Sequence, residues 1–197
     1  MDFDDVIRAR RSVRRFTEDR VDADTLCKLI EAGVQAPSAC NLQGWRFRVL
    51  GEEEQRRMVG LGAASVVERA PLAVVVLYPR SSDAYHDEIQ SAAACIQNML
   101  LKATELGLGG CWVCHLPAKW RLRRLLAIPF HYDISACVVF GYPQHEPRPV
   151  PRRSTYQELF ELERPRVTWR AVAKFLYVRQ PFRPAFIERR FTRRFEN

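Results

Sequence analysis

The stretch that decides the fold is Ser91–His115, which reads SAAACIQNMLLKATELGLGGCWVCH. Its first half is rich in Ala, Leu and Met, so a helix there would be apolar on nearly every side. Such a helix needs other elements around it, and we expect the longest helix of the chain at 84–106, in the centre of the fold. Gly107 is expected to end it. The glycine-flanked segment Gly110–His115 is then predicted to follow as a buried strand.

Helical and strand patterns alternate on both sides of this stretch. Helices are expected at 2–9, 22–34, 52–61 and 118–127, and strands at 45–50, 72–77 and 134–140. Several of these strands are apolar throughout, which is typical of a sheet covered on both faces. We therefore predict an α+β fold, a layered structure with helices on both sides of a sheet.

Composition limits the class of protein. The 197 residues, 47% of them hydrophobic, suffice for one substantial core. The first residues, MDFDDVIRARRSVRRF, contain no apolar segment of the kind that a secretory signal needs. The apolar run at 71–78 is too short to span a bilayer. A cytoplasmic, reducing location is expected, in which the six cysteines are free thiols.

The motif GCWVCH at 110–115 allows several interpretations. C-x-x-C-H is the attachment pattern of c-type haem, and C-x-x-C alone suggests a redox dithiol or half of a zinc site. A cytoplasmic location argues against haem, and the remaining cysteines form no second close pair for zinc. A dithiol of the thioredoxin type should open a helix, whereas this segment is predicted as a strand. Core packing of both cysteines is the favoured interpretation.

A cluster of arginines follows the first expected helix. The segment Arg10–Phe16 reads RRSVRRF. Guanidinium groups donate paired hydrogen bonds to phosphate, and a serine hydroxyl adds another donor. A phosphate site is one interpretation, and a solvated basic turn is the other.

A polar loop is expected between the second helix and the first strand. It reads APSACNLQGW at Ala36–Trp45. Short polar side chains and backbone donors in such a loop can hydrogen-bond the edge of a planar heterocycle, with Trp45 covering its face. The same residues also fit a simple helix stop with an Asx-type turn.

Taken in order, RRSVRRF, A-P-S-x-x-N-x-Q-x-W, QNMLLKATELGLGGCW and VVFGYP resemble the nitroreductase family of flavin enzymes, over residues from about 3 to about 160. The resemblance implies a three-layer fold with a mixed, mostly antiparallel sheet flanked by helices. It also implies an obligate homodimer with FMN at the interface. The implied activity is hydride transfer from NAD(P)H through FMN N5 to a small acceptor such as a nitroaromatic or a quinone. No metal is implied.

The resemblance also implies which residues contact FMN. For the phosphate and ribityl chain these are Arg10, Ser12, Arg14, the backbone of Arg11, and Arg153, with Arg152 as the alternative to Arg153. For the isoalloxazine ring they are Pro37, Ser38 and Asn41, partly from the other protomer, and Cys114 and His115 at the N5 edge.

The N5 position of the family is usually glycine, and His115 stands there in this chain. No catalytic side chain is required by the resemblance. His115 is a candidate proton donor to the substrate, because histidine exchanges protons near neutral pH. Alternatively its ring turns into the core. In either case the resemblance makes GCWVCH a haem motif by coincidence.

The end of the chain differs in composition from the rest. Residues 166–197 carry nine Lys and Arg against two Glu, a net +7 of the total +8. We expect a domain at 1–160 and a basic amphipathic extension at 161–197. The extension is interpreted as an arm over the partner protomer or as a contact with an anionic membrane surface. Nucleic acid is disfavoured, because no binding fold for it is recognised. A flavin- or ligand-binding module tethered by this extension is the alternative function.

Overall fold

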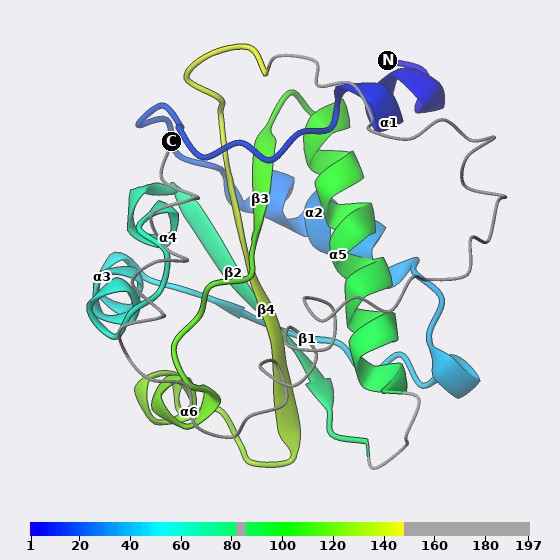
Figure 1. The fold of residues 1–197 in the computed structure, drawn as a ribbon. Helices are drawn as coiled ribbons and strands as arrows, with labels where there is room; N and C mark the ends of the chain where they lie inside the picture. The colour runs from blue at the N-terminus through cyan, green and yellow to red at the C-terminus, as the bar shows by residue number, and fades with distance from the viewer. Residues whose placement is uncertain (82–85, 148–197) are drawn as a thin grey trace, which may run out of the picture. The chain divides into compact units, whose positions relative to one another are not determined.

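The computed structural model describes residues 1–81 and 86–147, and it contains a four-stranded sheet between two helical layers (Figure 1). The strands are β1 (Arg46–Val49), β2 (Leu72–Pro79), β3 (Gly109–Val113) and β4 (Tyr132–Gly141). Their order is β1-β2-β4-β3, and each neighbouring pair is antiparallel. A bridge between Ser12 and Gly110 adds one parallel pairing. The predicted α+β class is confirmed.

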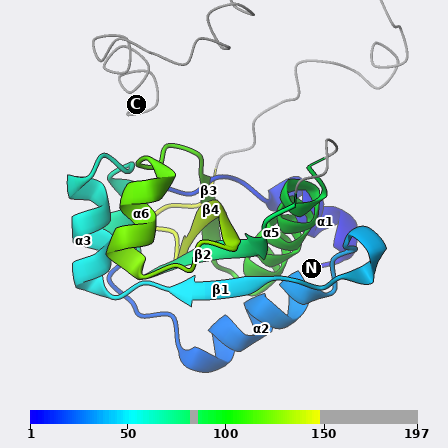
Figure 2. The ribbon, with the colours of Figure 1, turned by 90° about the horizontal axis from the view of Figure 1, so that it is seen from below.

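Seven helical segments accompany the sheet in the described residues. They are α1 (Phe3–Ala9), α2 (Ala23–Val34), the 3-10 turn η1 (Ala39–Asn41), α3 (Glu52–Gly60), α4 (Val66–Arg69), α5 (Asp87–Glu105) and α6 (Lys119–Leu126). Asp22 caps α2, since its carboxylate accepts a hydrogen bond of 2.7 Å from the Thr25 backbone N–H. Figure 2 shows α3 and α6 on one side of the sheet and α2 and α5 on the other.

The layer of α2 and α5 packs on alternate residues of the central strands. Val74 and Val76 of β2 face this layer and are fully buried beside Ile96 and Met99 of α5. A Cβ on Gly33 would lie 2.8 Å from Met99 Cγ, so only glycine lets α2 approach α5 this closely. The core of this layer therefore depends on both the apolar face of α5 and a small residue on α2.

The expected burial of α5 on nearly every side is wrong for one protomer. Its Cys95 face is buried, but Ala93, Ala94 and Leu101 are half-buried and Ile89 is exposed. The helix also begins at Asp87 rather than at residue 84. The reason is that α2 and the sheet cover only part of the helix circumference within this chain.

The opposite layer contains α3, α4 and α6. Alternate residues of the same strands, such as Val75 and Val139, face it and are fully buried. Helix α4 was not predicted, because four residues are too few to show a helical period. Its last carbonyls are satisfied by the buried Gln55 of α3, whose Nε2 donates to Val67 O at 2.7 Å and to Ala70 O at 2.9 Å.

Strand β3 ends at Val113, earlier than the predicted end at His115. Cys111 is buried on the strand, while Cys114 is exposed after it, so core packing holds for the first cysteine of GCWVCH and is wrong for the second. Beyond the end of the strand, the His115 carbonyl accepts a 3.2 Å hydrogen bond from Ala64 N. All six cysteines are free thiols, as expected.

Candidate functional site

The arginine segment, Arg10–Phe16, meets the free edge of β3 at Ser12 and then passes to the residues after β4, where Phe16 bridges Pro143. Ser12 pairs with Gly110 in a parallel bridge, and Val13 N donates to Gly110 O at 3.0 Å. Val13 is buried, whereas Ser12 and Arg14 are exposed. The backbone pairing thus turns one apolar side chain inwards and leaves the polar groups on the outer side.

Two glycines at the start of β3 allow neighbouring side chains to pack closely against its backbone. A Cβ on Gly109 would lie 2.6 Å from both Cβ and Cγ2 of Val13, and a Cβ on Gly110 would lie 2.6 Å from Leu100 Cδ2. Real Cβ atoms do not come this close to other carbons. Gly109 is therefore a condition for docking the arginine segment on β3, whereas Gly110 makes room for Leu100 of α5.

The arginine segment offers donors suited to an anion. Arg11 Nε is buried and has no hydrogen-bond partner, while its Nη1 donates to Arg10 O at 2.9 Å. Burial raises the pKa of the Cys111 thiol, and the positive charge of Arg14 acts in the opposite direction, so that guanidinium lies within electrostatic range of β3. A buried N–H without a partner and two exposed polar side chains are hydrogen-bonding groups of the kind that bind an anion.

Cys114 and His115 lie past the far end of β3 from the bridge to Ser12. Both side chains are exposed, so the alternative that His115 turns into the core is wrong. Cys114 is four positions after Gly110, which corresponds to roughly 13 Å along an extended strand. The β3 edge therefore carries hydrogen-bond donors suited to an anion near one end, and a histidine and a thiol at the other.

The loop at residues 36–45 has a strained backbone. Cys40, Asn41 and Gln43 have φ values of 50°, 53° and 47°, in the left-handed region that non-glycine residues seldom adopt. Such strain persists only where the surroundings enforce it, and it concentrates at functional sites. None of these three residues is glycine, so their conformation could not be read from the sequence.

Hydrogen bonds to α5 and within the loop hold this conformation. Ser91 Oγ accepts from Ala39 N at 3.2 Å, and Ser91 O accepts from Trp45 Nε1 at 3.0 Å. Ser38 Oγ accepts from Gln43 N at 3.0 Å, across five residues of the loop. The Trp45 ring is 5% exposed and packs edge-on against Tyr78, so it belongs mainly to the core.

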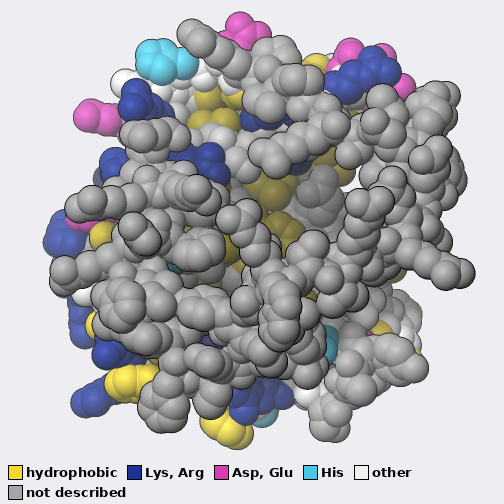
Figure 3. Space-filling model, viewed as in Figure 1, with side chains coloured by type: hydrophobic (Ala, Val, Ile, Leu, Met, Phe, Trp, Pro, Cys, Tyr) yellow, Lys and Arg dark blue, Asp and Glu magenta, His cyan; other side chains and the backbone are white. Residues whose placement is uncertain are grey.

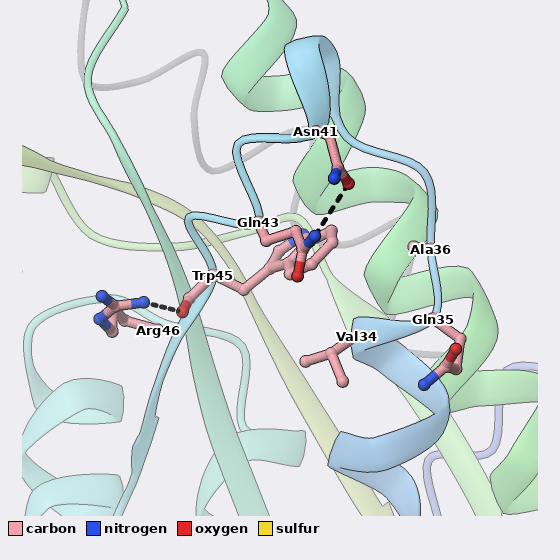
Figure 4. Close-up of a pocket in the computed structure, with 7 residues that line it drawn as sticks. All are labelled: Val34, Gln35, Ala36, Asn41, Gln43, Trp45 and Arg46. Atoms are coloured by element: carbon pink, nitrogen blue, oxygen red, sulfur yellow. Dashed lines mark hydrogen bonds between the residues drawn. The ribbon is translucent and has the colours of Figure 1, made fainter.

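A cavity of about 530 Å³ opens beside this loop. Figure 4 shows the residues that line it: Val34, Gln35, Ala36, Asn41, Gln43, Trp45 and Arg46. Asn41 Oδ1 accepts a 2.9 Å hydrogen bond from Gln43 Nε2, and Arg46 Nη1 donates to Trp45 O at 2.7 Å. Gln35, Gln43 and Arg46 were not predicted as site residues, because only the folded chain brings them together.

The predicted FMN contacts fall into two groups within one protomer. The arginine segment and His115 lie at the β3 edge, whereas the loop with Pro37, Ser38 and Asn41 precedes β1 at the other edge. Three strand spacings separate these edges, roughly 14 Å. One chain alone does not bring the two groups together.

Some sequence predictions lie outside the described residues. Arg152 and Arg153 are among them, as is the extension at 161–197. Among residues 1–81 and 86–147, no three His, Cys, Asp or Glu side chains are grouped to hold a metal ion. Within the same residues, no helix has the length and apolar character needed to cross a membrane.

Comparison with known proteins places these observations in context. The model of the family described as "Nitroreductase family" matches residues 7–62 and 58–142. A protein of Methanothermobacter thermautotrophicus, which carries a provisional NADH dehydrogenase/NAD(P)H nitroreductase name, is 31% identical over 75% of this chain and 80% of its own length. An NADH dehydrogenase of Thermus thermophilus is 32% identical over 71% of this chain and 86% of its own length.

Solved structures share the fold. A Desulfovibrio desulfuricans protein, provisionally named a nitroreductase and solved in complex with FMN, is 28% identical with a TM-score of 0.71, covering 84% of this chain and 98% of that one. A nitroreductase family protein of Streptococcus pneumoniae is 20% identical with a TM-score of 0.74, covering 82% of this chain and all of that one, and shows the fold alone.

Proposed function

The chain belongs to the nitroreductase family, and we propose that it is an FMN-dependent oxidoreductase that takes hydride from NAD(P)H and passes it to a small acceptor such as a nitroaromatic or a quinone. The observation that carries this proposal is the arginine segment on the β3 edge. It presents Ser12, Arg14 and the unpartnered Nε of Arg11 about one strand length from His115.

The donor set of the β3 edge fits FMN. An unsatisfied buried N–H costs about 1–3 kcal/mol, and an anionic oxygen beside Arg11 Nε would remove that cost. We assign the phosphate and ribityl chain to Arg10, Ser12 and Arg14. The buried Nε of Arg11 would donate a further hydrogen bond to a phosphate oxygen. Arg153 is proposed to add a second guanidinium, with Arg152 as its alternative.

The other end of β3 is where we place the reacting edge of the ring. Bound FMN would supply the hydride-transfer chemistry, while the protein supplies orientation and hydrogen bonds. The backbone N–H of His115 is proposed to point at N5, and the Ala64 hydrogen bond to the His115 carbonyl would hold that peptide in place. The exposed His115 imidazole is the candidate proton donor to the acceptor, and Cys114 is its neighbour at the ring edge.

A homodimer explains the two separated groups of predicted contacts. We propose that the loop with Pro37, Ser38 and Asn41 reaches the flavin of the partner protomer. Apolar side chains support this assembly: Phe3 is 69% exposed and Ile89 is 49% exposed, on the helices α1 and α5 that pack against each other. Single exposed apolar residues are common on protein surfaces, so these two side chains are candidate contacts that substitution of Ile89 tests.

The cytoplasmic location and the role of residues 161–197 stay predictions. The tethered binding module depends on that extension, and no observation on the described residues favours it. The choice between NADH and NADPH and the identity of the acceptor are likewise questions for kinetics.

The proposal is tested by exchanging neighbouring arginines. Arg14→Ala removes an assigned phosphate ligand, and we expect at least a tenfold rise in the Kd for FMN, because charge-assisted hydrogen bonds contribute about 1.5–3 kcal/mol. Arg15→Ala is the matched control, since Arg15 is also exposed and takes no assigned part. Equal FMN affinity in both variants would remove the arginine segment from the site.

A further inference from the structure

A basic surface with two exposed aromatic rings lies on α6 and the loop after it. We call it the α6 patch, and it comprises Lys119, Trp120, Arg121, Arg124 and Phe130 together with Arg80, which follows β2 and lies over the Phe130 ring. Trp120 is 63% exposed and Phe130 is 74% exposed, among the highest values for large apolar side chains in the described residues. Figure 3 shows Lys and Arg side chains beside hydrophobic ones along the margin that α6 occupies in Figure 1.

The aromatic rings and the guanidinium groups of the α6 patch are in contact. Arg80 Cζ lies 4.2 Å from the centre of the Phe130 ring, and Arg121 Cζ lies 5.3 Å from that of Trp120. These separations are those of cation–π pairs. Charge and apolar area are therefore combined in one surface.

The scaffold under the α6 patch is held by Arg123. Its Nη1 donates to Pro129 O at 2.8 Å, its Nη2 donates to Tyr132 O, and it lies 3.6 Å from the Asp133 carboxylate. Asp133 also pairs with Lys119 at 2.5 Å. Across residues 1–81 and 86–147, no carboxylate pairs with Arg80, Arg121 or Arg124, so the α6 patch keeps a net positive charge.

This charge narrows the possible occupants. The C-terminal stretch 166–197 has a net charge of +7, and a second copy would present the same positive surface, so both are repelled. An anionic partner remains. Single-stranded nucleic acid binds by stacking bases on open aromatic faces, and here guanidinium groups already lie over Phe130 and near Trp120.

A lipid surface needs only exposed apolar area and nearby positive charge. Trp and Phe insert at the boundary of headgroups and acyl chains, while arginines contact lipid phosphates. We propose that the α6 patch docks the protein on anionic lipid membranes, with Trp120 and Phe130 inserted at the interface and Arg80, Arg121 and Arg124 on the phosphates. This proposal is independent of the flavin chemistry.

The test is sedimentation of the full chain with vesicles of phosphatidylcholine alone and of phosphatidylcholine mixed with phosphatidylglycerol. We expect binding to the mixed vesicles. The double variant Arg121→Gln/Arg124→Gln should bind about 30-fold more weakly, because each basic residue near an anionic surface contributes about a fivefold factor. The matched control is Arg20→Gln/Lys28→Gln, which also removes two positive charges. Lys28 lies in α2, on the other side of the sheet, and Arg20 precedes α2. This control should lose less than threefold in affinity for the mixed vesicles.

A second measurement separates insertion from general attraction of charge. Brominated phosphatidylcholine in the mixed vesicles should quench part of the tryptophan emission, and Trp120→Phe, a mild change at an exposed position, should abolish that part. Equal weakening by the two double variants would assign the binding to overall charge and overturn the proposal. Quenching that survives Trp120→Phe, or binding to single-stranded oligonucleotide but not to vesicles, would also overturn it.

Discussion

Gly109→Ala tests the docking of the arginine segment on β3. The new Cβ would lie 2.6 Å from Val13 Cβ and Cγ2 and 2.8 Å from Cγ1, about 1 Å inside the separation of carbons in contact. Val13 Cβ is bonded to the backbone and cannot rotate away, and turning the side chain about χ1 moves only the two Cγ atoms. Overpacking of this kind costs about 1–3 kcal/mol, so we expect the free energy of unfolding to fall by about 2 kcal/mol.

The same substitution should push the arginine segment off the β3 edge and weaken FMN binding, which fluorescence titration measures. Val13→Ala removes two of the three close atoms. In the double variant the two costs should therefore be less than additive, by at least about 1 kcal/mol in urea unfolding. Gly60→Ala is the control, because a Cβ there has no atom within 4 Å.

Two results would refute this reasoning. If Gly109→Ala is as stable as the Gly60→Ala control, the close approach of Val13 to β3 is not real. If its stability falls but its FMN affinity is unchanged, the arginine segment docks as described but does not hold the cofactor.

Three further predictions concern the core, the thiols and the interface. Gln55→Ala should lower the free energy of unfolding by about 2–4 kcal/mol, because it leaves the buried carbonyls of Val67 and Ala70 without a donor. Urea unfolding of the variant and the wild type measures this loss, and a loss below about 1 kcal/mol would contradict the prediction. Burial raises the pKa of Cys95 and of Cys137 from 9.0 to about 12, so the folded state keeps protons that the unfolded state loses. Stability should therefore be unaffected below pH 9 and fall between pH 9 and 12, by about 1.4 kcal/mol per pH unit for each thiol, and Cys95→Ala should reduce that slope by the contribution of one thiol. Ile89→Asp should dissociate the proposed dimer in light scattering, whereas an unchanged mass would place the interface elsewhere.

The strongest sequence signals were the long apolar segments. The Ala- and Leu-rich run predicted α5, and the apolar run at 71–78 predicted β2, because regular burial leaves a regular pattern. The arginine segment was recognisable because its residue types carry the chemistry. Its position on β3 was not, since the pairing of Ser12 with Gly110 joins residues far apart in the chain.

Other features left no readable signal. The left-handed residues Cys40, Asn41 and Gln43 are not glycines, and their backbone is set by contacts with α5. The end of β3 at Val113, which leaves Cys114 exposed, is not marked by any periodicity of the sequence. The order of the strands, which separates the two groups of predicted contacts, is likewise a property of the fold.

The central claim is that the chain binds FMN and uses it for hydride transfer. The most direct measurement is the absorption spectrum of the freshly purified protein, repeated on the supernatant after heat denaturation and on the intact protein after anaerobic addition of NADH or NADPH. We predict flavin bands that move into the supernatant on heating and bleach with reduced nicotinamide. A colourless protein that fails to take up added FMN, or a sharp Soret band that stays with the protein, would contradict the account.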